Sequence, residues 1–94
     1  MKINTKQVLT GFDSKPLPSE NGDLTVSAVI SKCLGAEKSP DPLKAFILAQ
    51  KFYTQDEVEV DASDKIFIKE AMRSSQFWTP LVIGQILIIL DEAK

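Results

Sequence analysis

Apolar residues recur at three- and four-residue spacing in four stretches of the chain, which is typical of helices that bury one face. The first stretch follows Asp23 and Thr25, either of which can cap a helix. Its apolar positions are Val26, Val29, Ile30, Cys33 and Leu34. Gly35 suits the left-handed position just beyond a helix, so we expect the first helix to end there.

The second helix has the clearest start, because Asp41 is a good N-cap and Pro42 fits the first helical position. One face of this helix carries Leu43, Phe46, Ile47, Gln50 and Tyr53. A second apolar strip carries Ala45, Leu48, Ala49 and Phe52. Two apolar strips predict a helix that packs against two neighbours.

Valine alternates with carboxylates over residues 56–61, and this period of two predicts a short extended piece. An N-terminal strand is its candidate pairing partner. Asp61 or Ser63 then caps a third helix. The residues expected to face inward in it are Ile66, Phe67, Ile68, Ala71 and Met72.

The last helix begins with Thr79 as N-cap and Pro80 at the first position, and residues 81–90 are apolar nearly all round. Such a helix has to be covered on nearly every side. It is either the central helix of a monomer or half of a homo-oligomer interface, and Gly84 would permit close helix approach in both cases. The candidate interface residues are Trp78, Leu81, Ile88 and Ile89.

Phe77 and Trp78 precede this helix and admit two interpretations. An aromatic residue before a helix usually staples its start to the core, which is the interpretation we favour. Tryptophan is also preferred at binding hot spots, so an exposed anchor is the alternative.

Residues 1–22 differ from the rest, with spaced apolar positions followed by a turn-forming stretch that contains two prolines. We expect a strand or hairpin there, or an arm that orders only on a partner. Residues 23–94 form the helical domain. The predicted fold is mainly α, a small four-helix domain with a short N-terminal β-strand or hairpin, compact as a whole.

Composition narrows the functional classes. The chain has 94 residues and a net charge of −2, and its lysines and arginines are scattered. This disfavours direct binding to nucleic acid or to an anionic membrane. The ten-residue apolar stretch is half of the about 20 residues that a bilayer span needs, and no signal peptide is visible. A cytoplasmic location is expected.

The chain has no histidine and one cysteine, Cys33. Histidine-based acid–base catalysis, catalytic triads and the usual zinc sites are therefore excluded. Cys33 lies in an apolar stretch and is expected to be a buried core thiol. We predict no catalytic residue, no metal site and no cofactor.

One charged feature stands out. The candidate acidic patch consists of Asp56, Glu57, Glu59, Asp61 and Asp64. Ordinary solvated charge is the favoured interpretation. The alternatives are a divalent-cation site, although the spacing does not match an EF-hand loop, and mimicry of nucleic-acid phosphates.

Five segments carry a family resemblance. They are Met1-Lys2-Ile3-Asn4, Gly11-Phe12-Asp13-Ser14-Lys15-Pro16-Leu17, Leu24-Thr25-Val26, Leu48-Ala49-Gln50-Lys51-Phe52-Tyr53 and Leu81-Val82-Ile83-Gly84-Gln85. Together they resemble a group of small proteins encoded by tailed bacteriophages and prophages. The resemblance implies a setting, the bacterial host cytosol, and no activity or functional residue.

The sequence therefore favours a non-enzymatic interaction or assembly protein that binds itself or another protein. The alternative is an acidic decoy that inhibits a host nucleic-acid-handling protein through its acidic patch. A small metal-dependent enzyme ranks lowest.

Overall fold

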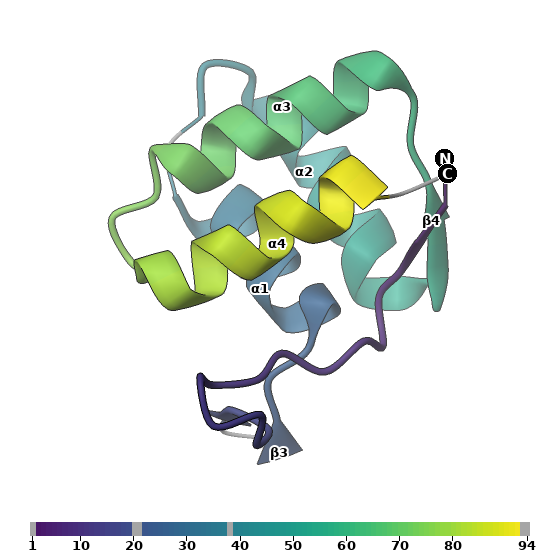
Figure 1. Cartoon of the computed structure of the whole chain (residues 1–94). Coiled ribbons are helices and arrows are strands. Elements are labelled where there is room, and N and C mark those ends of the chain that lie inside the picture. The colour runs from purple at the N-terminus through teal and green to yellow at the C-terminus, as the bar shows by residue number, and fades with distance from the viewer. Residues whose placement is uncertain (1, 20–21, 38, 93–94) are drawn as a thin grey trace.

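The computed structural model describes residues 2–19, 22–37 and 39–92, and it has the mainly α fold that the sequence predicts. Figure 1 shows the helices packed around one another, with the short strands at the periphery. The helices are α1 (Val26–Ala36), α2 (Pro42–Thr54), α3 (Ala62–Arg73) and α4 (Pro80–Glu92). The strands are β1 (Lys2–Asn4), β2 (Pro18–Ser19), β3 (Gly22–Asp23) and β4 (Glu57–Glu59).

Side-chain caps fix where three of the helices begin. The Thr25 hydroxyl and the Asp41 carboxylate each accept a hydrogen bond from the amide three residues further on, which satisfies a free N–H of the first turn. Asp61 and Asp64 form a reciprocal capping box at the start of α3. Thr25 and Asp61 are thus the caps among the predicted alternatives.

The prediction that the first helix ends at Gly35 is wrong. Helix α1 continues through Gly35 to Ala36, and Glu37 caps it in an extended conformation. A Cβ atom at Gly35 would lie 3.7 Å from the Cβ of Ala49 on α2. That distance is ordinary van der Waals contact, so Gly35 is a residue within α1 that faces α2 and does not make a left-handed turn.

The core takes one face from every helix. Its largest fully buried side chains include Phe52, Ile3, Leu9, Ile30, Ile68, Met72, Ile86 and Leu90. Burial of side chains this large is the main favourable contribution to folding. Ile3 and Leu9 come from the N-terminal segment, so this segment shares the core of the helices.

Helix α2 buries only one of its two predicted apolar strips. Ala45, Leu48, Ala49 and Phe52 are buried. Leu43, Phe46, Ile47 and Tyr53 of the other face are 68%, 61%, 44% and 76% exposed. Helix α2 does contact two elements, α1 and β4, but no described element covers its second apolar strip. Ile66 on α3, expected to face inward, is likewise exposed.

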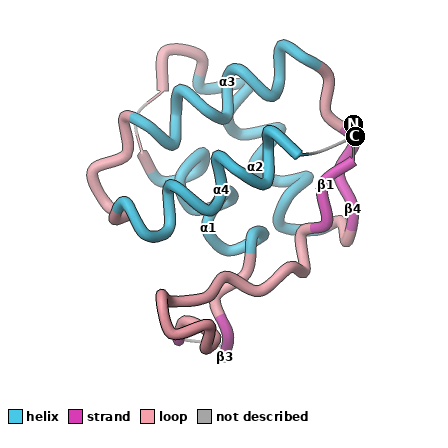
Figure 2. Tube along the Cα trace, in the orientation of Figure 1, coloured by secondary structure: helices cyan, strands magenta, loops and turns pink. Residues whose placement is uncertain are grey.

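The predicted pairing between the N-terminal strand and the acidic segment is confirmed. Strands β1 and β4 are antiparallel, with buried Ile3 opposite buried Val58 (Figure 2). The Thr5 hydroxyl is 2.5 Å from the carbonyl oxygen of Gln55 and 2.9 Å from that of Asp56. These contacts tie the N-terminal segment to the end of α2.

Helix α4 is less enclosed than its composition suggests. Val82, Ile86 and Leu90 are buried, whereas Ile88 is 57% exposed. The expectation that the helix is covered on nearly every side is wrong on the side of Ile88. A Cβ atom at Gly84 would meet nothing within 4 Å, so no helix approaches there.

Candidate functional site

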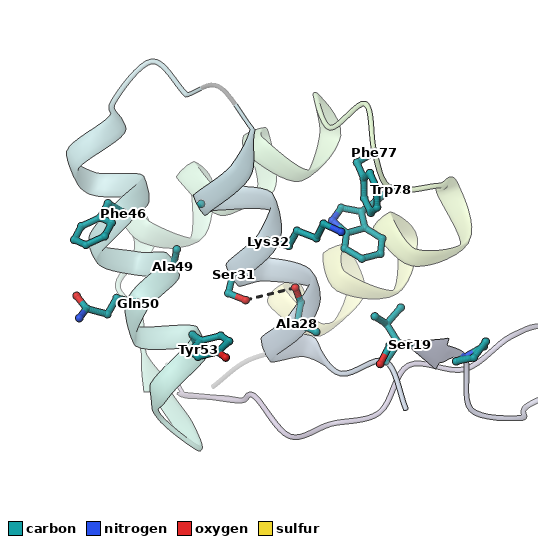
Figure 3. A pocket seen from close by; sticks show the side chains of 13 residues that line it. Ser19, Ala28, Ser31, Lys32, Phe46, Ala49, Gln50, Tyr53, Phe77 and Trp78 are labelled. Atoms are coloured by element: carbon teal, nitrogen blue, oxygen red, sulfur yellow. Dashed lines mark hydrogen bonds between the residues drawn. The ribbon is translucent and has the colours of Figure 1, made fainter. Parts of the chain in front are cut away.

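A groove of about 790 Å³ runs along α1. Ligand sites commonly have volumes of about 300–1,000 Å³. The groove is bounded by α2 on one side and by the loop before α4 on the other (Figure 3). Its lining residues are Pro18, Ser19, Leu24, Ala28, Ser31, Lys32, Gly35, Phe46, Ala49, Gln50, Tyr53, Phe77 and Trp78.

Helix α1 forms the floor of the groove. Ala28, Ser31, Lys32 and Gly35 line it, at the i, i+3, i+4, i+7 spacing of one helix face. Three of these side chains are small, and the Ser31 hydroxyl hydrogen bonds within its own helix to the Ala28 carbonyl, at 3.5 Å. The groove is hollow along α1 because three of the four residues on this helix face are small.

Helix α2 supplies one wall at the same spacing, through Phe46, Ala49, Gln50 and Tyr53. Ala49 is buried at the base, Phe46 and Gln50 form the outer edge, and Tyr53 points toward α1 in Figure 3. Two large aromatic side chains that are mostly exposed leave a substantial apolar area in water. Exposed apolar side chains beside a hollow are available for contact with another molecule.

The opposite wall is a pair of aromatic rings. Phe77 and Trp78 pack edge to face with their centroids 4.8 Å apart. The Lys32 ammonium lies 4.0 Å from the Phe77 centroid and 5.9 Å from that of Trp78, which are cation–π distances. Among the described residues that line the groove, Lys32 is the only lysine, arginine, aspartate or glutamate.

Trp78 packs as the favoured staple interpretation predicts, and its role as a binding anchor stays a prediction. It is partly buried and packs against the core, as a staple would, and it also lines the groove. Its indole nitrogen Nε1 is buried, and no described residue accepts a hydrogen bond from it. An unpartnered buried N–H is uncommon in folded proteins, because it costs about 1–3 kcal/mol.

Glu37 holds the aromatic loop in place. Its carboxylate accepts hydrogen bonds from the Ser75 hydroxyl at 2.7 Å and from the Gln76 amide at 2.9 Å. The Ser75 hydroxyl oxygen in turn accepts from the amides of Phe77 and Trp78. Burial acts to raise the pKa of Glu37, but these hydrogen bonds outweigh it and hold the pKa below its ordinary value.

The Cys33 thiol is buried, as the sequence predicts. Burial, together with the nearby Glu37 carboxylate, raises the pKa of Cys33 to about 12. The thiol lies 3.6 Å from the Ala71 carbonyl oxygen, to which it donates. A thiol protonated at neutral pH is a poor nucleophile, so Cys33 serves packing.

The candidate acidic patch is divided among separate local roles. Asp56 pairs with Lys6 at 3.2 Å across an exposed surface. Asp61 and Asp64 cap α3, and Asp64 also lies 3.6 Å from the ammonium of Lys44. Glu57 and Glu59 are exposed on β4. Within the described residues, no three Asp, Glu or Cys side chains are placed to hold a metal ion.

The candidate interface residues of the last helix do not form one surface with Trp78. Leu81 and Ile89 are half-buried, and Ile88 is exposed. Of the four residues named from the sequence, only Trp78 lines the groove. The groove was missed because the second apolar strip of α2 was expected to be covered. The i, i+3, i+4, i+7 spacing of small residues on α1 was the available clue.

No helix within residues 2–19, 22–37 and 39–92 has the length and apolar character needed to cross a bilayer. No protein-family model, curated protein sequence or solved structure matches this chain.

Proposed function

We propose that this chain is a non-enzymatic protein-binding module that docks an amphipathic helix of another protein in the groove along α1. The observation that carries the proposal is the uncovered aromatic surface beside a floor of small residues. Helix-in-groove recognition places the apolar face of a helix in such a hollow.

The shape of the groove supports a helical occupant. The floor and the α2 wall each run from position i to position i+7, which is about two helical turns or about 11 Å. Both faces repeat at three- and four-residue spacing, so their ridges match those of a helix laid alongside. A docked helix would cover the part of the uncovered α2 strip that lines the groove, which is Phe46, Gln50 and Tyr53.

The residues expected to contribute most to binding are the large rings at the edges. Phe46 and Tyr53 are 61% and 76% exposed, so truncating them removes contact area without opening the core. Aromatic side chains dominate binding energy at many interfaces. The distribution of the acidic residues over capping and ion-pair roles gives the decoy hypothesis no comparable support.

The first test replaces both rings, as Phe46→Ala with Tyr53→Ala. Helical peptides selected from a displayed 16-residue library on the full chain serve as probes. We expect the double variant to weaken binding at least tenfold, because it removes two large aromatic contact surfaces. The fluorescence of the single tryptophan, Trp78, reports binding directly since that residue lines the groove.

Phe12→Ala is the matched control, because Phe12 is 95% exposed and lies outside the groove. It should leave both binding and unfolding unchanged. Selected peptides that bind the double variant as tightly as the parent chain would overturn the proposal. A concentration-dependent dimer abolished by the double variant would replace it with self-association, measured by light scattering.

A further inference from the structure

The aromatic end of the groove holds two hydrogen-bond donors that lack an acceptor. The Lys32 ammonium lies over the rings of Phe77 and Trp78, and no described residue forms an ion pair with it. The Trp78 indole N–H is buried without an acceptor. Figure 3 shows the Lys32 side chain extending from α1 toward the indole of Trp78.

These two groups cannot satisfy each other. A lysine ammonium has three donors and no acceptor, and the indole nitrogen is a donor only. The nearest carboxylate of the loop, Glu37, is already engaged by Ser75 and Gln76. Neither donor therefore has an acceptor within the described part of the chain: solvent hydrates the exposed Lys32 ammonium, and the buried Trp78 N–H has none.

We infer that the docked helix presents an aspartate or glutamate side chain at this end of the groove, paired with Lys32. The inference rests on the proposed function and adds the chemistry of the partner. The carboxylate carries the charge complementary to the one cation in the lining and has two acceptor oxygens. The inference also requires the side chains around the buried indole N–H to rearrange on docking, so that the same carboxylate can accept from it.

The surroundings strengthen such a pair. The aromatic walls exclude water from one side of Lys32, and a docked helix would exclude it from the other. Charge pairs gain strength when solvent screening is reduced. A helix without an acceptor here would leave the ammonium covered and unpaired, which disfavours its binding. The pair thus selects acidic amphipathic helices over neutral ones.

The test uses the peptides selected on the full chain, with each Asp or Glu replaced in turn by Asn or Gln. We expect one replacement in each peptide to weaken binding about tenfold or more, the scale of a charge-assisted hydrogen bond. Lys32→Gln should cause a similar loss. Combining the two changes should add little further loss, because both remove the same pair.

Lys51→Gln is the matched control, since Lys51 lies on α2 outside the groove and changes the net charge equally. It should leave affinity within about twofold. The single indole N–H proton resonance provides a second readout. It should move downfield with the acidic peptide and move less with its amide counterpart, because hydrogen bonding deshields the proton.

The outcomes separate the two claims. Peptides that require Phe46 and Tyr53 but tolerate loss of every carboxylate overturn the inference and leave the proposed function standing. Equal losses with Lys32→Gln and Lys51→Gln also overturn it, because they indicate a general charge effect. Absence of any peptide sensitive to the Phe46 and Tyr53 changes overturns the proposed function, and the inference with it.

Discussion

Glu37 is a single side chain on which the geometry of one groove wall depends. It follows α1, yet its carboxylate holds Ser75 and Gln76, which precede the aromatic pair. The hydroxyl of Ser75 then fixes the amides of Phe77 and Trp78. The position of the wall is thus set by hydrogen bonds that span nearly 40 residues of sequence.

The lowered pKa of Glu37 predicts an acid-sensitive contribution to stability. A group whose pKa falls on folding stabilises the folded state above its unfolded pKa of about 4.3, and that contribution is lost as the pH falls through the folded pKa. Glu37→Gln should therefore lower the free energy of unfolding by about 1 kcal/mol at pH 7 and by less near pH 3.

Urea unfolding between pH 3 and pH 7 measures this dependence. Glu57→Gln on exposed β4 removes one carboxylate without these hydrogen bonds and controls for the change in net charge. If the two variants lose the same stability at every pH, the hydrogen bonds of Glu37 do not have the role assigned to them.

At the scale of elements, α4 is joined to the N-terminal segment by a polar side chain within its apolar sequence. The Gln85 amide nitrogen donates to the Thr10 carbonyl at 2.6 Å, and its side-chain oxygen accepts from the Thr10 amide at 3.0 Å. Gln85 thereby supplies both partners of one residue's backbone, as a neighbouring strand would. The segment has this anchor in addition to buried Leu9.

Gln85→Leu should lower the free energy of unfolding by about 1–3 kcal/mol, because it leaves both backbone groups of Thr10 without their partner in a half-buried site. Chemical denaturation measures the loss, and faster hydrogen exchange of the Thr10 amide locates it. Ile88→Gln, at an exposed position of the same helix, should cost far less. Equal costs for both changes would contradict the anchoring role.

At the scale of the whole molecule, the N-terminal segment belongs to the core and is not an appendage. Ile3 and Leu9 are each 1% exposed. Strand β1 pairs with β4, which follows α2 and precedes α3 in the chain. A domain of 94 residues has a small margin of stability, of about 5–15 kcal/mol. Truncating one buried isoleucine or leucine to alanine costs about 2–5 kcal/mol. The free energy lost with two such side chains and a strand is therefore comparable with the stability of the whole domain.

A fragment of residues 23–94 should therefore fail to unfold cooperatively, although it contains all four helices. Circular dichroism during thermal and urea denaturation tests this, with the full chain as the reference. Adding a synthetic peptide of residues 1–22 should restore a cooperative transition if the segment supplies only its missing contacts. A fragment that unfolds in one sharp transition by itself would show that the helices form a sufficient core.

Local patterns were enough to predict much of this architecture. Asp41 with Pro42 marks the start of α2 by chemistry contained within one turn, and the alternation around Val58 indicates a strand in the same way. Caps and hydrophobic periods act between residues close in sequence. The helix order, the short strands and the burial of Cys33 therefore followed from the sequence.

Tertiary packing decided the rest. The two strips of α2 look alike in sequence, and only the positions of α1 and β4 determine that Ala49 is buried while Phe46 is left in water. Gly35 likewise resembles a helix terminator, yet α1 continues through it to Ala36 and places it beside Ala49 of α2. The groove depends on which faces meet, and contacts between distant segments are fixed by the whole fold rather than by local preference.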